Sequence, residues 1–230
     1  MARKPARRRI TNPLALAVLA LLFERPMHPY EMAATLRERA KDASIKLNYG
    51  SLYTVVDRLQ ELAYIVPRET SREGRRPERT VYALTDEGRT EMREWLSDLV
   101  RRPVKEYPQF EAAISLLGVL PPDEAAALLT ERVQQLDQDI ASDRAIIDQA
   151  VAEGLPRLFV MEGEYELAIR RAELDWTRNL RDQIASGSLE GLDQWRAFHE
   201  GQPDAFALSE DALRSSGAAT QRRKEEDAMR

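Results

Sequence analysis

One stretch of the sequence, residues 48–59, restricts the fold more than any other, because it predicts a helix with two unlike faces. Its apolar residues follow the spacing of one helical stripe: Leu52, Val55, Val56, Leu59, Leu62 and Ala63. The opposite side carries Gly50, Tyr53, Thr54 and Asp57, with Arg58 at the flank. Asn48 can cap the helix, since its side-chain oxygen can accept from a free amide of the first turn. We therefore expect a helix anchored on one side that presents a small, polar and aromatic face on the other.

The residues around this helix favour a nucleic-acid partner. Gly50 removes a side chain where the helix N-terminus would approach a partner backbone, and free amides there suit a phosphate. Residues 64–70 and 79–85 predict a hairpin, and its tip at residues 71–78 is rich in arginine and contains Gly and Pro. A helix followed by a basic hairpin is the layout of a winged helix-turn-helix, with the helix in the major groove and the wing along the DNA backbone.

Three motifs give the sequence a family resemblance. They are Pro-Met-His-Pro-Tyr-Glu-Met at residues 26–32, Tyr-Gly-Ser-Leu-Tyr at 49–53, and Gly-Arg-Arg-Pro-Glu-Arg-Thr-Val-Tyr-Ala-Leu-Thr-Asp-Glu-Gly at 74–88. In this order and spacing they resemble the PadR family of bacterial transcriptional regulators. The resemblance covers residues 1–100 strongly and extends in a looser way to residue 187. Many family members carry Pro at positions 49 and 54, where this chain has Tyr49 and Thr54, so its base contacts are expected to differ.

The resemblance implies a cytoplasmic, homodimeric repressor that binds two-fold related half-sites of double-stranded DNA. The chain looks like the longer-tailed members of the family, in which a helical C-terminal domain mediates dimerisation, and family members often release DNA when a small effector binds. The resemblance also implies a phosphate contact for the Tyr30 hydroxyl. Tyr53 and Thr54 are expected at base edges, and Ser51 and Lys46 at phosphates. The candidate DNA-binding residues are Tyr30, Lys46, Tyr49, Gly50, Ser51, Tyr53, Thr54, Arg58, Arg72, Arg75, Arg76 and Arg79.

Composition limits the other classes of function. The chain has no cysteine and only two histidines, His28 and His199, which argues against thiolate or histidine-built metal sites and against disulfides. The net charge of −5 hides an asymmetry, because residues 1–90 carry about +6 and residues 91–230 about −11. The basic part is the one with the predicted winged helix. The apolar run at residues 14–23 is too short to cross a bilayer and predicts a buried helix.

The N-terminal region divides into an arm and a domain of mainly helical character. Residues 1–10 are a basic arm, and residues 11–100 are the winged helix-turn-helix, with a three-helix core and a two-stranded wing. Its first helix is expected at residues 13–24, and its second at 29–41 with Met32, Ala33, Leu36 and Ala40 in the buried stripe. Thr85 should cap a further helix at residues 86–100 that contains Trp95. Two prolines at residues 103 and 108 mark a linker.

The C-terminal half predicts a helical dimerisation domain at residues 108–198, followed by a disordered tail at 199–230. Helices are expected at residues 110–120, 123–153 and 157–186. The apolar stripes on the two long helices are wider than one neighbour needs, which suggests a partner subunit. Asp143 interrupts the coiled-coil seam and is a candidate for fixing its register. The candidate dimerisation residues are Leu129, Val133, Leu136, Ile140, Ile147, Tyr165, Ile169 and Trp176.

The remaining functional question is a ligand. Trp95, Phe110, Phe159 and Trp176 are candidates for an effector pocket, although aromatic residues at helical spacing mostly fill cores. The sequence has no phosphate-cradling glycine loop, no His-Glu metal spacing and no serine nucleophile elbow, so we expect no enzyme and no cofactor. Two alternatives stay open: a winged helix used as a protein-interaction module, and a ligand sensor with weak DNA specificity.

Overall fold

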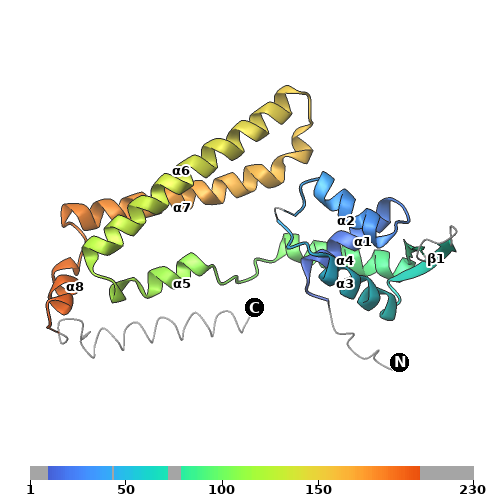
Figure 1. Ribbon diagram of the computed structural model, residues 1–230, viewed down its shortest axis with the longest axis horizontal. Coiled ribbons are helices and arrows are strands. Elements are labelled where there is room, and N and C mark those ends of the chain that lie inside the picture. The colour runs from blue at the N-terminus through green and yellow to red at the C-terminus, as the bar shows by residue number, and fades with distance from the viewer. Residues whose placement is uncertain (1–9, 43, 72–78, 203–230) are drawn as a thin grey trace. The chain divides into compact units, whose positions relative to one another are not determined.

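The computed structural model describes residues 10–42, 44–71 and 79–202, and the chain divides into two compact units, residues 1–106 and 107–230 (Figure 1). The fold class predicted from the sequence is confirmed: a winged helix-turn-helix in the first unit and a helical second unit. No helix within the described ranges is long and apolar enough to cross a membrane.

The first unit has a three-helix core, a hairpin and a fourth helix. The elements are α1 (Pro13–Glu24), α2 (Pro29–Glu38), α3 (Tyr49–Glu61), β1 (Ile65–Ser71), β2 (Arg79–Leu84) and α4 (Asp86–Arg101). Each helix begins at a residue whose side chain accepts from a first-turn amide, namely Asn12, His28, Asn48 and Thr85. The apolar α1 is the centre of the core, since it packs against α2, α3 and α4 and buries Leu14, Val18 and Leu19 completely.

The hairpin is tied to the helical core by backbone hydrogen bonds. Strands β1 and β2 pair antiparallel, with Ile65 opposite Leu84 and a register shift between Pro67 and Glu69. Tyr82 also exchanges two backbone hydrogen bonds with Met27 in the connection between α1 and α2, at 3.1 and 3.0 Å. The base of the wing is therefore fixed to the helices, because it shares backbone bonds with a segment between them.

A close backbone contact joins the end of α3, the hairpin and the start of α4. The Thr85 hydroxyl donates to the carbonyls of Ala63 and Tyr64 at 2.8 and 3.0 Å, and its oxygen accepts from the Gly88 amide at 2.9 Å. A Cβ on Gly88 would lie only 2.1 Å from the Tyr64 carbonyl oxygen. Glycine is required at this position, because any other residue would overlap the backbone of the neighbouring segment.

Two helix ends depart from ordinary backbone geometry. Helix α2 ends at Glu38 rather than at Lys41, and Ala40 is exposed with a φ of 53°, so its predicted place in the buried stripe is wrong. Ala63, which follows α3, has a φ of 58°. Both residues let the chain reverse direction after a helix in the left-handed conformation, as a C-terminal glycine normally does.

Ion pairs connect α1 and its C-cap to α2. Arg39 donates two hydrogen bonds to Glu24, at 2.6 and 2.8 Å, and this contact lowers the pKa of the Glu24 carboxyl below its ordinary value. Arg25 pairs with Glu31 at 2.5 Å and lowers the pKa of that carboxyl in the same way. All four side chains are well exposed, so these pairs align the helices more than they stabilise the unit.

The second unit is built on two long helices. Its elements are α5 (Gln109–Ser115), the short 3₁₀ helices η1 (Leu117–Val119) and η2 (Arg157–Phe159), α6 (Pro122–Ala152), α7 (Met161–Ser186) and α8 (Leu192–His199). Figure 1 shows α6 and α7 side by side as a hairpin. Val133 and Leu136 of α6 bury themselves against Leu174 of α7. The unit is closed by α8, whose Trp195 ring nitrogen donates to the Leu120 carbonyl at 2.8 Å.

Charged pairs set the register of this hairpin. Asp143, the polar residue in the predicted seam, pairs with Arg170 of α7 at 2.6 Å. Arg132 pairs with Glu173, and Asp137 with Arg178. Near the turn, α7 approaches so closely that a Cβ on Gly163 would lie 2.9 Å from the Ile147 side chain. The partners lie opposite one another on α6 and α7, so a shift of one helical turn would separate them all.

We predict that Gly88→Ala destabilises the first unit by about 1–3 kcal/mol, because the new methyl group must displace the Tyr64 backbone. Thermal unfolding monitored by circular dichroism measures this as a lower Tm. The matched control is Gly50→Ala, where a Cβ meets only the Asn48 side chain at 3.7 Å. That substitution should leave stability unchanged or raise it by up to about 1 kcal/mol, because alanine favours the helix. Equal effects of the two substitutions would contradict the close contact.

Candidate nucleic-acid interface

Helix α3 has the two faces that the sequence predicts. Leu52, Val56 and Leu59 are essentially inaccessible to solvent and pack into the core of the first unit. The Tyr53 side chain is 46% exposed, and Thr54, Asp57 and Arg58 are exposed as well. A helix held so firmly by one face can offer the other to a groove without losing its place in the fold.

The N-terminus of α3 is capped and open. The Asn48 side chain accepts from the Ser51 amide at 2.7 Å, as predicted, and the Ser51 hydroxyl donates to the Asn48 carbonyl at 3.1 Å. Apart from the adjoining residues and the helix's own backbone, the nearest atom to a Cβ on Gly50 would be the Asn48 side-chain oxygen, at 3.7 Å. A partner backbone can therefore approach the first turn closely, and the positive end of the helix dipole favours a phosphate there.

Two hydrogen-bond donors on the exposed side of α3, those of Thr54 and Arg58, already have partners within the protein. The Thr54 hydroxyl donates to the Gly50 carbonyl at 3.0 Å, which leaves its methyl group as the surface suited to a thymine methyl. Arg58 is paired with Glu61 at 2.6 Å, so its charge is partly compensated. Of the residues expected to contact bases, Tyr53 is therefore the one that presents an exposed aromatic side chain to a partner.

Residues on two neighbouring segments complete the described part of the interface. Tyr30 lies in the first turn of α2 and is 64% exposed, and Lys46 is exposed just before α3. Tyr82 on β2 is half-buried near the reading helix. The pKa of Tyr82 lies above its ordinary value, first because of burial and then because of the charge of Asp57 and the neighbouring Tyr53.

The predicted wing cations fall largely outside the described residues. Arg72, Arg75 and Arg76 lie outside them altogether, and Arg79 and Tyr49 are described only by their backbone. One wing cation was missed by the sequence analysis: Arg68, which is exposed on β1 at the register shift after Pro67. The signal for it was present, since a basic residue followed a proline in a predicted edge strand.

The predicted dimerisation residues separate into two groups. Leu129, Val133 and Leu136 are covered within the subunit, and Ile140 and Ile147 are partly covered there by α7, so these five form the intramolecular seam. Tyr165, Ile169 and Trp176 on α7 are instead 70, 54 and 49% exposed. The inner face of α7 uses Leu167, Leu174, Thr177 and Ile184, none of which is among the predicted dimerisation residues.

The predicted effector-pocket residues of the second unit, Phe110, Phe159 and Trp176, do not all meet. Trp95 is buried in the core of the first unit, as an ordinary packing residue. Phe159 and Trp176 are separated by 17 positions along η2 and α7, which corresponds to about 25 Å of helix. Phe110 and Trp176 do meet, edge to face, with ring centroids 6.1 Å apart. The guanidinium group of Arg132 lies over the Phe110 ring, with its carbon 3.7 Å from the ring centroid.

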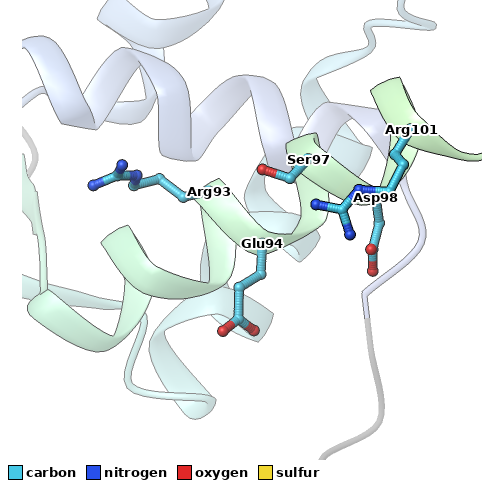
Figure 2. Close-up of a pocket in the computed structure, with 5 residues that line it drawn as sticks. All are labelled: Arg93, Glu94, Ser97, Asp98 and Arg101. Atoms are coloured by element: carbon cyan, nitrogen blue, oxygen red, sulfur yellow. The ribbon is translucent and has the colours of Figure 1, made fainter.

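A polar hollow of about 300 Å³ lies on α4 (Figure 2). It is lined by Arg93, Glu94, Ser97, Asp98 and Arg101, which all come from this one helix. Its charged walls do not resemble the apolar enclosure of a small-molecule site. In the part of the chain that the structure describes, no group of His, Asp and Glu side chains could hold a metal ion.

Comparison with known proteins matches part of the first unit to a protein family. Residues 18–94 match the family model of the transcriptional regulator PadR-like family. The structure of Bacillus subtilis PadR in complex with operator DNA is similar, with a TM-score of 0.60 and 19% identity over 75% of this chain and 99% of that one. The structure of the same protein in complex with p-coumaric acid has a TM-score of 0.60 and 18% identity, and the match covers 75% of this chain and 98% of that one. The structure of the Vibrio cholerae virulence activator AphA has a TM-score of 0.55 and 16% identity, and the match covers 75% of this chain and 98% of that one.

The comparisons confirm the resemblance stated from the sequence. The family match covers the segment from α1 to α4 that contains the predicted winged helix, so the chain carries a PadR-like domain. At identities below 20%, the likeness to the solved structures shows the shared fold. No curated protein sequence matches the chain.

Proposed function

We propose that this chain, which carries a PadR-like domain, is a homodimeric, sequence-specific DNA-binding regulator that represses transcription in the bacterial cytoplasm. The observation that carries the proposal is α3, whose buried face fixes it in the core while its capped N-terminus and Tyr53 stay exposed. The B. subtilis protein of the same fold has been crystallised with operator DNA, which supports the same partner here.

The proposed complex uses different residues for position and for sequence. The α3 N-terminus, with Gly50 and Ser51, approaches phosphates, and Tyr30 and Lys46 hold the neighbouring backbone. Tyr53 and the Thr54 methyl group contact base edges in the major groove. The wing arginines and Arg68 follow the adjacent backbone or minor groove. Repression follows sterically where the operator overlaps a promoter.

The proposed dimer forms through the outer face of α7. Met161, Tyr165, Ile169 and Trp176 follow steps of four, four and seven residues, and all are about half exposed or more. Such a continuous apolar stripe is unusual on a monomer and fits an interface. A second copy is the simplest partner, because two reading helices related by a two-fold axis match two operator half-sites.

A small-molecule effector is part of the proposal. The Phe110–Trp176 pair, with Trp176 half exposed, offers an aromatic surface beside Arg132, whose charge is paired with Glu173. The B. subtilis relative has been crystallised with p-coumaric acid, an aromatic carboxylic acid. Binding would favour a dimer whose reading helices no longer match the spacing of the half-sites.

We predict that the protein binds a labelled DNA of its own upstream region, and that Tyr53→Ala weakens this binding about 5- to 150-fold, as loss of a good base contact does. In Arg75→Ala/Arg76→Ala, the slope of log affinity against log salt should fall by about two. Arg171→Ala, on an exposed part of α7, is the control and should change neither quantity.

Two outcomes would contradict this reading of the first unit. Equal affinity for DNA of any sequence would exclude a specific operator in the upstream region. A folded dimer that does not bind DNA at low salt would favour the protein-interaction module, because phosphate contacts are strongest there.

We predict that Ile169→Asp converts a dimer into monomers, because the carboxylate would be buried without a partner in the apolar stripe. Sedimentation equilibrium measures the change. Arg171→Asp places the same group two residues away, outside the stripe, and should leave the dimer intact. A wild-type monomer, or a dimer unaffected by Ile169→Asp, would rule out this interface.

We predict that p-coumaric acid, used as a probe, lowers operator affinity of the wild-type protein but not of Phe110→Ala, which removes the ring that meets Trp176 and leaves the outer stripe of α7 unchanged. Fluorescence anisotropy of the labelled operator follows the titration. An unchanged wild-type affinity would exclude this compound as an effector, and an equal response of both proteins would place the site elsewhere.

A further inference from the structure

Asp57 is the one charged residue on the reading face of α3 that the proposed contacts leave unused. It lies one turn after Tyr53 on the same side of the helix, and its side chain is exposed. No basic residue stands three or four positions away to pair with it, and the adjacent Arg58 is bound to Glu61 at 2.6 Å. Among the described residues, Asp57 has no ion-pair or hydrogen-bond partner.

Asp57 is exposed on α3 and lies close enough to Tyr82 to act on it electrostatically. Its charge contributes to the raised pKa of Tyr82, after the larger effect of burial, and Tyr53 adds to the same shift. Asp57, Tyr53 and Tyr82 therefore lie close to one another, and Glu61, which is paired with Arg58, follows one turn later on the same side of the helix. This is the side that enters the groove if Tyr53 contacts bases.

An unpaired carboxylate at this place restricts what it can meet on DNA. It only accepts hydrogen bonds, and it is repelled by phosphates, so it cannot serve as a backbone contact. The donors that bases present in the major groove are the cytosine N4 and adenine N6 amino groups. A carboxylate near any other base edge would face acceptors or a methyl group and would lose its water without compensation.

Cytosine suits a carboxylate better than adenine. The adenine amino group stands beside N7, an acceptor that repels the second carboxylate oxygen, whereas an asparagine or glutamine amide complements both atoms. Cytosine presents its amino group without an acceptor beside it on the same base. Asp57 and Tyr53 are four residues apart, or about 6 Å along the helix, which is close to two base-pair steps.

We propose that Asp57 is a specificity-determining residue that accepts a hydrogen bond from the N4 amino group of one cytosine in each half-site, about two base pairs from the Tyr53 contact. This inference rests on the proposed function, since it needs α3 in the major groove. It assigns to Asp57 the choice of one base pair, and not a share of general affinity.

The test measures the affinity of wild type and variants for operators in which each base pair is replaced in turn. Wild-type affinity should fall at least about fivefold when one C·G pair per half-site is replaced. Asp57→Ala should respond less than about twofold at that position and keep the wild-type pattern elsewhere. Asp57→Asn should prefer A·T there, because an amide complements adenine.

The control is Glu94→Gln, which removes one negative charge from exposed α4 and should leave every base preference unchanged. Identical base preferences in wild type and Asp57→Ala, or an equal affinity change at all positions, would overturn the assignment while leaving the DNA-binding function intact. A wild-type protein without any base preference would overturn both. Circular dichroism of each variant confirms that the proteins compared are folded.

Discussion

The contact of the Tyr64 backbone with Thr85 and Gly88 is the point on which the first unit depends. The Tyr64 carbonyl accepts from the Thr85 amide and hydroxyl, both at 3.0 Å, and leaves no room for a side chain on Gly88. The end of α3, the base of the wing and the start of α4 meet there. A recognition helix and a wing can bind one DNA site together only if their relative position is fixed. The backbone contacts among these three segments fix that position.

The second unit uses one helix for two purposes. The inner face of α7 packs on α6 through Leu167 and Leu174, and its register is held by pairs such as Arg170 with Asp143. The outer face keeps Tyr165, Ile169 and Trp176 exposed. A helix with apolar residues on opposite sides is expected to lie between two neighbours. One neighbour is α6 of the same chain, and the proposed dimer supplies the other.

Sequence patterns predicted the elements of the first unit closely, because local chemistry marks their ends. Asn48 and Thr85 cap the helices they were expected to cap. The end of α2 was missed, since Ala40 takes a left-handed conformation that normally requires glycine. In the second unit, periodicity located the long helices but assigned Leu129, Val133 and Leu136 to a dimer, although they pack within the subunit. An apolar stripe shows that a face is covered and does not show by which chain.

The central claim is that two α3 helices read two half-sites of one operator. Hydroxyl-radical footprinting of the protein on its own upstream DNA tests this most directly, because it maps backbone protection without assuming a sequence. The account predicts two protected regions related by a two-fold axis, with centres about 10–10.5 base pairs apart or a multiple of that spacing. A single region without symmetry, or protection spread evenly along the DNA, would contradict it.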